Sequence, residues 1–518
     1  MMTKDSLTER QSPTATPLAL AGVLGLSLLV CAVAISDQSF WIDECGVAQK
    51  AMLPTLKAFW QQISTEGSAD LQQPFHHFYA WGWEKVFGID EFGLRSANIP
   101  FLLLGMAVVL FAFRGTPGLL AGMLLAAFTS PFVWYYLNEA RPYSVQLCAS
   151  LIVFSSMFKL SKDQPIRNET SWVWILCSGI VLLAVSGMLA MLWLGAYILA
   201  ALLATPQSRL KSILARHLFA FALTALLLLG MGMFYLWTLS IGARATAVGG
   251  TDLRNFAFIV FEVLGFSGFG PGRLAIRNDG LRAFAPWIHW LALYGLALLA
   301  VLFAGLRTVR LTFPARVRWS WLLSFLLVAF FILGVGVVAH FRVLGRHCTP
   351  VFPLVLFILG AGASSLWANR RSHSRWATPI FACIAIASCL MVRFNERHSK
   401  DDYRSAARVA NASLQKGEVV WWSASPEGAI VYGLPLSTNV LPGSALFVAN
   451  PESGFAAGLP APSLVVSSKP DVYDAKGALA LFLKGGYKPA TNFVAFAVWR
   501  EQGQQEASQT LELSRPPR

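Results

Sequence analysis

The sequence predicts a polytopic α-helical membrane protein with about 11 transmembrane helices and a small C-terminal α/β domain. Its 518 residues are 55% hydrophobic and only 13% charged, and the mean hydropathy is +0.55. Soluble proteins carry about 25% charged residues and disordered chains have low hydrophobicity, so both classes are excluded. The apolar residues fall into blocks of roughly 20 residues, the length that crosses a bilayer.

The first apolar block, 17–35, follows a polar segment, 1–16. It is long for a signal peptide and has no evident cleavage site, so we interpret it as the first transmembrane helix. A break near Gly187 divides the long block 171–205 into two short crossings. The remaining spans are expected at 96–113, 119–137, 143–160, 217–237, 286–305, 319–339, 350–367 and 377–393.

The loop 36–95 has mixed character. Segments 47–63 and 74–87 combine helical apolar spacing with many aromatic residues, which is typical of helices in the membrane interface. We therefore divide the chain into a transmembrane module, 1–393, that includes this loop, and a C-terminal domain, 394–518.

The C-terminal domain is richer in polar residues, Pro and Gly. Its pattern predicts helices and strands in one small α/β domain, and a disordered end of about 15 residues. The helices are expected at 402–415 and 474–485, and the strands at 418–422, 463–467 and 492–499.

The charge distribution predicts the topology. Short connections rich in Lys and Arg are expected in the cytoplasm, which places the N-terminus inside and, after 11 crossings, the C-terminal domain outside. The basic residues of these loops explain the net charge of +14. The sequence contains no basic tract with interleaved aromatic residues, so it does not predict a nucleic-acid partner. Their basic residues are Arg114, Lys159, Lys162, Arg167, Arg209, Lys211, Arg216, Arg307, Arg310, Arg316, Arg318, Arg370, Arg371 and Arg375.

Three ionisable clusters lie at predicted external helix ends, where charged groups are candidates for function. The first, 40–44, holds the adjacent carboxylates Asp43 and Glu44. Asp43 could act as a general base for an acceptor hydroxyl. The alternatives are a solvated loop, or a helix N-cap at Asp43 before a helix over 44–53.

The second cluster, 134–143, joins two adjacent spans and holds Glu139 and Arg141. Arg141 could bind a phosphate or carboxylate in bidentate geometry. The alternative is a contact with Glu139 or with a lipid headgroup.

The third cluster, 340–347, contains two arginines and two histidines. Arginines on the external side run against the positive-inside rule and favour an anionic partner, although snorkelling to the headgroups is the alternative. The glycine-rich stretch 265–272 lacks the strand and helix of a phosphate loop, so we interpret it as a flexible external loop. Arg273, Arg277 and Arg282 after it could help to hold an anion.

The seven cysteines have no metal-binding spacing, although Cys45 and Cys348 could pair. Adjacent histidines point in different directions on a helix, so His76 and His77 are not expected to share a metal.

In order, the motifs resemble the GT-C superfamily of polyprenyl-phosphate-sugar-dependent glycosyltransferases, family 39 type, which includes aminoarabinose and protein-mannosyl transferases. They are an acidic pair after the first span, a Pro-aromatic interfacial helix, a Phe-Gly step before an Arg, a Tyr-Tyr-x-x-Glu-Ala-Arg-x-Tyr turn, a late Arg-aromatic-x-x-Pro-x-x-Pro segment, and an Asp-Tyr-Arg-Ser-Ala-Ala entry to the tail. In this sequence they are 41–44, 73–79, 87–95, 135–143, 346–353 and the tail entry 402–407.

The resemblance implies a GT-C fold in the bacterial inner membrane, with the active site and C-terminal domain in the periplasm. It implies an inverting transfer of a sugar from a polyprenyl-phosphate donor, such as an undecaprenyl phosphate, to a hydroxyl of a lipid, glycan or protein acceptor of the cell envelope. The implied roles are catalysis for Asp43 and Glu44, donor-phosphate binding for Arg141, Arg346, His347 and Arg95, and orientation of substrate for Glu139, Tyr143, His76, His77 and Gln73.

Two positions depart from the family pattern. Gln73 stands where Lys or His is frequent, and His347 stands where Tyr is common. No cofactor is required, but two carboxylates can supply oxygen ligands, so a divalent metal near Asp43 and Glu44 stays open. The alternative function is a transporter or flippase, which predicts midplane charges and internal repeats. The sequence identifies neither the sugar nor the acceptor.

Overall fold

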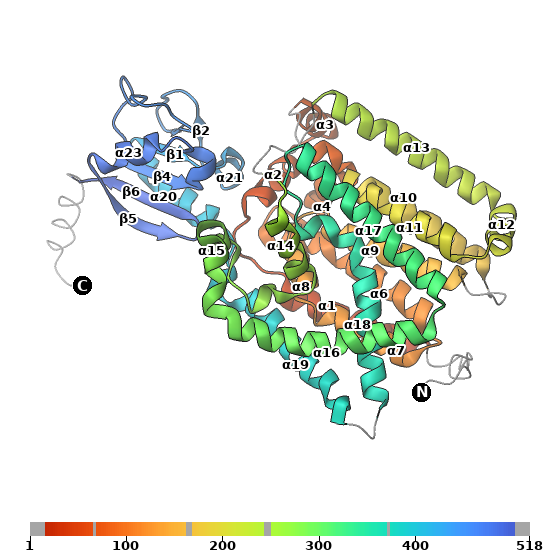
Figure 1. Ribbon diagram of the computed structural model, residues 1–518. Coiled ribbons are helices and arrows are strands. Elements are labelled where there is room, and N and C mark those ends of the chain that lie inside the picture. Colours follow the sequence, from red (N-terminus) through yellow and green to blue (C-terminus); the bar gives the residue numbers. More distant parts are fainter. Residues whose placement is uncertain (1–15, 66–68, 162–167, 243–249, 370–372, 503–518) are drawn as a thin grey trace. The chain divides into compact units, whose positions relative to one another are not determined.

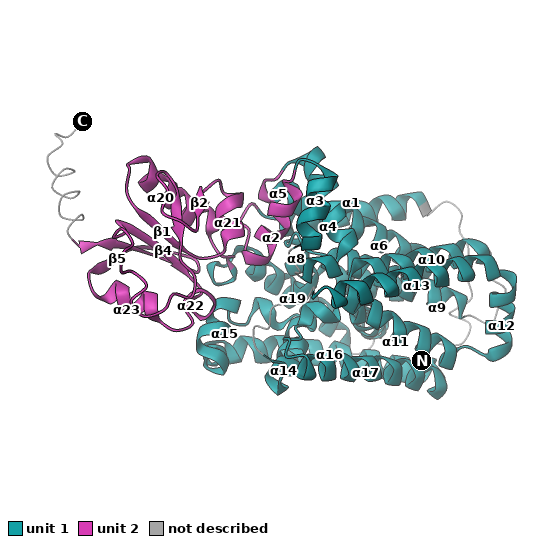
Figure 2. Ribbon diagram, turned by 90° about the horizontal axis from the view of Figure 1, so that it is seen from above, with its two compact units in different colours: residues 1–36, 54–88, 92–398 teal, residues 37–53, 89–91, 399–518 magenta. Residues whose placement is uncertain are grey.

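The computed structural model describes residues 16–65, 69–161, 168–242, 250–369 and 373–502 (Figure 1). The expectations for the N-terminal segment, for Lys162, Arg167, Arg370 and Arg371, and for the last 15 residues lie outside these ranges. The chain forms two compact units (Figure 2): unit 1 is 1–36, 54–88 and 92–398, and unit 2 is 37–53, 89–91 and 399–518. Two segments of the first loop therefore belong to the unit that contains the C-terminal domain.

Unit 1 is built from long apolar helices. Among the described residues, nine helices are long and apolar enough to span a bilayer, and two bent pairs raise the number to eleven. They comprise α1 (Thr16–Ala34), α6 (Ile99–Phe113), α7 (Pro117–Phe128), α8 (Pro131–Leu137), α9 (Tyr143–Leu160), α10 (Glu169–Ser186), α11 (Met188–Ala204), α12 (Gln207–Arg216), α13 (Leu218–Ser240), α16 (Ile288–Thr312), α17 (Ala315–Val338), α18 (Phe352–Ala368) and α19 (Ala377–Phe394).

The predicted spans are confirmed, including the break at Gly187 between α10 and α11. One expectation needs correction. The segment 119–137 is not one straight helix, because α7 and α8 meet at a bend of 55°. Pro131, at the first position of α8, has no amide hydrogen to continue the hydrogen bonds of α7.

Helix α18 packs closely against α7 and α16. A Cβ on Gly122 of α7 would lie 2.2 Å from the carbonyl oxygen of Gly360, and one on Gly362 would lie 2.0 Å from that of Val301 in α16. Small residues let membrane helices approach closely, where dispersion contacts hold them together. This packing fixes the helix ends from which the site residues project.

The remaining elements of unit 1 are short. They are α3 (Leu56–Thr65), η2 (Ala69–Gln72), α4 (Pro74–Phe87), η3 (Ser96–Asn98), α14 (Leu253–Val263), η4 (Phe266–Gly268), α15 (Arg273–Asp279), η5 (Gly280–Trp287), η6 (Gly345–Val351), η7 (His373–Trp376) and η8 (Glu396–His398), while α5 (Glu91–Arg95) crosses the unit boundary. The predicted helix 74–87 is confirmed as α4. The predicted helix 47–63 is two helices, because Pro54 separates α2 (Ile42–Ala51) from α3.

The glycine-rich stretch 265–272 is a packed turn rather than a flexible loop. A Cβ on Gly268 would lie 2.1 Å from the carbonyl oxygen of Ser388, and one on Gly272 would lie 1.8 Å from that of Arg397. The Arg397 guanidinium donates to the carbonyls of Gly268 and Gly270, at 2.7 and 3.0 Å. The glycines are therefore required by close approach of the backbones.

Unit 2 contains a six-stranded sheet of order β2-β3-β1-β4-β6-β5. Strands β2, β3, β1 and β4 are parallel, and β6 runs antiparallel to β4 and β5. Its elements after residue 399 are α20 (Tyr403–Gln415), β1 (Val420–Ser423), α21 (Pro426–Val431), β2 (Leu436–Ser437), β3 (Ala445–Phe447), β4 (Leu464–Ser468), α22 (Pro470–Tyr473), α23 (Ala478–Lys484), β5 (Tyr487–Phe493) and β6 (Phe496–Glu501).

The predicted helix 402–415 and the strands 418–422 and 463–467 are confirmed as α20, β1 and β4. The helix expected at 474–485 is shorter, α23. The single strand expected at 492–499 is wrong, because a turn at Val494 and Ala495 divides β5 from β6. Ala495 makes that turn with φ +66°, without the Gly or Asn that usually marks one.

Candidate active site

Three ionisable groups of unit 1, Asp70, His77 and Arg141, meet where α4 begins and where the turn 138–142 leads into α9. Asp70, in η2, places Oδ1 3.2 Å from Nε2 of His77 and 3.8 Å from Nη1 of Arg141. Pro74 opens α4 and puts both histidines in its first turn, facing this region. Arg141 is almost fully buried, so its ionic contacts form in a medium that screens them weakly.

His76 is held beside the same turn. Its Nε2 lies 3.3 Å from the carbonyl oxygen of Ala140, so Nε2 carries the proton and donates it. Burial, together with the adjacent His77 and Arg141, holds the pKa of His76 well below its ordinary value. His76 is therefore neutral at physiological pH and links α4 to the residue before Arg141.

Arg273 is the centre of a second charged group. Its Nη2 lies 2.6 Å from Oε1 of Glu262, and its Nη1 lies 3.6 Å from Oε1 of Glu139. Nη2 also donates to the Tyr136 hydroxyl at 3.2 Å, and the guanidinium stacks over the Tyr135 ring at 4.0 Å. The second ionisable cluster, 134–143, and Glu262 of α14 thus meet on Arg273, which binds carboxylates of the protein itself.

Glu262 joins this group to the segment that carries Arg346 and His347. Its Oε2 accepts a 2.9 Å hydrogen bond from the amide of Gly345, at the start of η6. A Cβ on Gly345 would lie 2.5 Å from Oε2, so only glycine permits this approach. The carboxylate is 4% exposed and satisfies two donors from two distant segments.

His347 is oriented by its backbone and by its ring. Its carbonyl accepts a 2.7 Å hydrogen bond from the Trp193 indole, and its Nδ1 accepts one from the amide of Leu344 at 3.1 Å. Nε2 therefore carries the proton in the neutral ring and is a donor. Arg346 precedes it in η6 and is half-buried.

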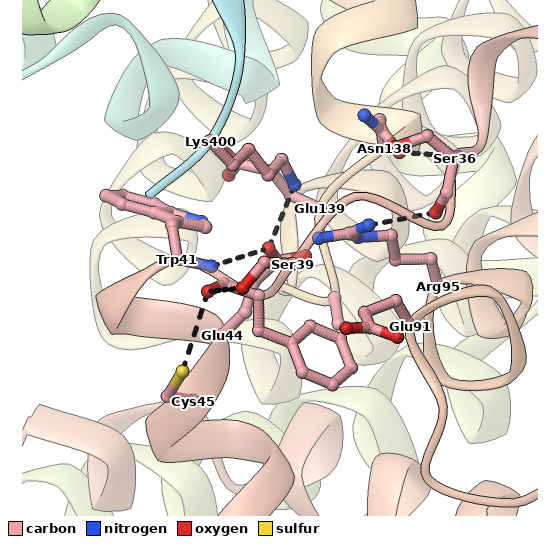
Figure 3. A network of polar contacts seen from close by, with 12 residues as sticks. Ser36, Ser39, Trp41, Glu44, Cys45, Glu91, Arg95, Asn138, Glu139 and Lys400 are labelled. Carbon is pink, nitrogen blue, oxygen red and sulfur yellow. Dashed lines mark hydrogen bonds and ion pairs between the residues drawn. The ribbon is translucent and has the colours of Figure 1, made fainter. Parts of the chain in front are cut away.

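The other predicted residues of unit 1, Tyr143, Gln73 and Arg95, each have different surroundings. Tyr143 is buried, with its ring 4.8 Å from that of Tyr136. Gln73 precedes α4, where its amide donates to the Asp70 carbonyl. Arg95 is fully buried and donates to the carbonyl of Ser36 at 2.9 Å, while Asn138 accepts from the Ser36 amide (Figure 3). Arg95 thus holds the chain that leaves the first span.

The acidic pair lies in unit 2. Glu44 is fully buried; its Oε2 lies 2.9 Å from Nζ of Lys400 and 3.4 Å from the Trp41 amide (Figure 3). Asp43 is half-buried in the first turn of α2. The expectation of an N-cap at Asp43 is wrong, because α2 begins at Ile42 and Trp41 is its N-cap. The two neighbouring carboxylates thus have different surroundings.

All seven cysteines are free thiols, so Cys45 and Cys348 form no disulfide. Within the described ranges no group of three or more His, Cys, Asp and Glu side chains is arranged to hold a metal ion.

Comparisons with solved structures address the fold. The chain matches ArnT from Cupriavidus metallidurans, in the apo state with a TM-score of 0.51 and bound to undecaprenyl phosphate with 0.50. Both alignments cover 94% of this chain and 98% of ArnT at 14% identity. The chain has a GT-C fold.

A mycobacterial arabinofuranosyltransferase, AftD, also matches, with a TM-score of 0.45 and 14% identity over 95% of this chain and 40% of AftD. No protein-family model matches the sequence, and no curated protein matches it significantly. The GT-C fold is therefore the part of the sequence-based interpretation that the structural comparison confirms.

Sequence reasoning missed three charged residues of these networks: Asp70, Glu262 and Lys400. Glu262 had a detectable signal, because it is the one carboxylate inside the apolar segment of α14, and an ionisable group in such a segment is a functional candidate. Asp70 lies four residues before Pro74, where the histidine-bearing helix α4 begins, and this is a weaker signal. Nothing in the sequence relates Lys400 to Glu44, which is 356 positions away.

Proposed function

We propose that the chain is an inverting glycosyltransferase that moves a sugar from a polyprenyl-phosphate donor to a hydroxyl acceptor at the periplasmic face of a bacterial inner membrane. One observation carries this proposal: nearly the whole chain has the fold of ArnT, which has been crystallised with undecaprenyl phosphate. The basic and neutral donor groups at the ends of the unit 1 helices support it, because a lipid phosphate is a suitable ligand for them.

We assign the donor phosphate to Arg141, Arg346 and His347. A guanidinium can bind two phosphate oxygens at once, and the proton on Nε2 of His347 can serve a third. The phosphate gains charge as the bond to the sugar breaks, so groups that bind it lower the barrier as well as the dissociation constant. His76, His77, Gln73, Glu139 and Tyr143 position the elements that carry these groups.

Asp43 is assigned as the general base. In the transfer it takes the proton of the acceptor hydroxyl while the hydroxyl oxygen attacks the anomeric carbon from the face opposite the phosphate. A new carbon–oxygen bond forms, the bond to the phosphate oxygen breaks, and polyprenyl phosphate leaves with the electron pair. Glu44 is fully buried against Lys400, so its role is to hold the first turn of α2, and Arg95, also buried, holds the preceding chain.

The test uses a deletion strain, because a strain without the transferase accumulates its unused donor. Detergent-solubilised membranes of that strain, which supply both the donor and the acceptor, are incubated with the purified full-length protein and analysed by mass spectrometry. Consumption of one lipid-linked sugar with release of polyprenyl phosphate would identify the donor. Asp43→Asn should reduce the rate by about 10²–10⁴-fold, the usual contribution of a general base.

Asp37→Asn is the matched control, since Asp37 is an exposed aspartate of the same loop. Transfer in detergent requires no movement across a membrane, so the assay also separates the alternative function. A transporter or flippase would consume no donor in micelles, and that result would overturn the proposal. Full activity of Asp43→Asn would instead remove only the assignment of the base.

A further inference from the structure

Unit 1 contains a large cavity that the proposed transfer does not use. Its volume is about 1390 Å³, above the roughly 300–1,000 Å³ of pockets for small metabolites. It is lined by the C-terminal parts of α6, α9, α11, α16 and α18, the N-terminal parts of α7, α10, α13 and α17, and part of α12. The ends of α9, α11 and α16 and the start of α17 lie toward the same end of the helix bundle (Figure 1).

The basic end of the cavity, at Arg114 and Arg316, is separate from the proposed donor-phosphate residues, none of which lines the cavity. Helix α9 starts at Tyr143, two residues after Arg141, and lines the cavity from Val153 onward. Ten residues of α-helix span about 15 Å. A phosphate at the turn 138–142 therefore cannot contact the part of α9 that lines the cavity.

The wall is apolar, as suits a hydrocarbon chain. Among its large side chains, Ile198 is 41%, Leu202 is 49% and Leu214 is 37% exposed. Burying such groups against an acyl chain is favourable in proportion to the apolar area covered. A polar metabolite would leave them in contact with its hydrated groups.

The charges at the cavity have one sign. Arg114, Lys159 and Arg316 line it, and its lining within the described residues contains no Asp or Glu. The neighbouring acid, Glu169, is already paired with Arg209 at 3.0 Å, Arg216 at 3.0 Å and His217 at 3.2 Å. The charge at the cavity is therefore complementary to an anion.

Helix α12 forms one side of the cavity and has the character of an interfacial helix. It turns by 119° from α11, places Leu210, Ile213 and Leu214 in the cavity wall, and directs Arg209 and Arg216 to Glu169. Amphipathic basic helices of this kind lie at the level of lipid headgroups. The basic rim is thus at the depth where a phospholipid carries its phosphate.

We infer that this cavity is a binding site for an anionic glycerophospholipid, with acyl chain inside the cavity and phosphate at Arg114 and Arg316. The inference is independent of the proposed function. Polyprenyl phosphate is the less suitable occupant, because the groups assigned to its phosphate, Arg141 before α9 and Arg346 and His347 in η6, do not line the cavity.

The test is native mass spectrometry of the delipidated full-length protein, titrated with phosphatidylglycerol, phosphatidylcholine of the same acyl chains, and undecaprenyl phosphate. Phosphatidylglycerol should bind one-to-one and more tightly than the other two lipids. The double substitution Arg114→Gln with Arg316→Gln should weaken its binding roughly ten-fold or more, because each arginine near a headgroup contributes a charge contact.

The matched control is Arg307→Gln with Arg310→Gln, which removes two exposed arginines near the same end of α16 that do not line the cavity. It should leave the binding unchanged. Ala225→Trp fills the cavity from an exposed position on α13 and should weaken binding of both phospholipids without disturbing the charges. Equal affinity for the two phospholipids, preferential binding of undecaprenyl phosphate, or no response to Ala225→Trp would each overturn the inference.

Discussion

Glu262 illustrates how one buried carboxylate organises the charged residues of unit 1. It contacts Arg273 at 2.6 Å and the amide of Gly345 at 2.9 Å, so it connects α15 to the segment of Arg346. Breaking one side of a buried ionic contact costs more than the contact contributes, since the other side stays buried and uncompensated. Replacing Glu262 would likewise remove this 2.6 Å ionic contact from the Arg273 guanidinium.

We predict that Glu262→Gln lowers the free energy of unfolding by about 1–3 kcal/mol, the cost of losing a hydrogen bond to a charged group. It should also slow sugar transfer, because η6 loses an anchor. Thermal unfolding in detergent measures the first effect and donor consumption the second. Glu396→Gln, at an exposed carboxylate, is the control. A Glu262→Gln protein as stable as this control would contradict the prediction.

His398 gives a pH dependence with a definite sign. Burial, with a smaller contribution from Arg397, lowers the pKa of His398 from 6.5 to about 4. Between these values the unfolded chain holds a proton that the folded protein does not, so stability falls as the pH falls through this window. The loss between pH 7 and pH 5 is about 2 kcal/mol.

His398→Gln should therefore show a smaller decrease in Tm between pH 7 and pH 5 than the wild type. His373→Gln, at an exposed histidine, should keep the decrease of the wild type. If His398→Gln and the wild type lose the same number of degrees, another group is responsible for the acid sensitivity.

Elements of this chain are delimited by prolines and packed through glycines. Pro54 separates α2 from α3, and Pro131 starts α8 at a bend of 55° from α7. Gly268 and Gly272 bring the turn before α15 against the backbone of Ser388 and Arg397. The position of Arg273 thus depends on glycines immediately before it in the chain.

Gly272→Ala should destabilise the protein by about 1–3 kcal/mol, because its Cβ would overlap the Arg397 carbonyl and force one backbone to move. Gly250→Ala is the control, since a Cβ there meets no atom within 4 Å. Comparing the Tm values of the two variants in detergent tests this prediction. Equal Tm values would mean that the backbone of the turn 265–272 can shift without any loss of stability.

At the scale of the whole molecule, unit 2 is assembled from three separate parts of the chain. Helix α2 packs against α21, and Phe40 and Ser39 contact the Tyr432 hydroxyl at 2.7 and 3.2 Å. Glu44 is paired with Lys400, and Phe40 is 1% exposed. The C-terminal segment by itself therefore lacks part of its core.

We expect a fragment of residues 399–518 to have a low Tm on its own and a higher Tm when a peptide of residues 37–53 is added. Binding of the peptide stabilises the folded fragment by mass action, so the increase should grow with peptide concentration. A peptide with Phe40→Ala and Glu44→Gln is the control. No response to the wild-type peptide would mean that the fragment is a complete domain.

The sequence predicted the elements well where one local signal dominated. Long apolar blocks gave α9 and α19 almost to the residue, and Pro74 gave the start of α4. It failed where a turn carried no marker, as at Ala495, or where a proline interrupted an otherwise helical pattern, as at Pro54. The apolar signal in both cases continued across the break.

For the candidate site, the sequence indicated candidate residues such as Asp43, Arg141 and Arg346, because charged groups are costly at helix ends in a membrane protein and stand out against apolar blocks. Only the tertiary structure decided their surroundings. It buried Glu44 against Lys400 and Arg95 against Ser36, and it joined Glu139, Arg273 and Glu262. These contacts link positions up to 356 residues apart, and no local pattern can specify a pairing that depends on how packed helices bring their ends together.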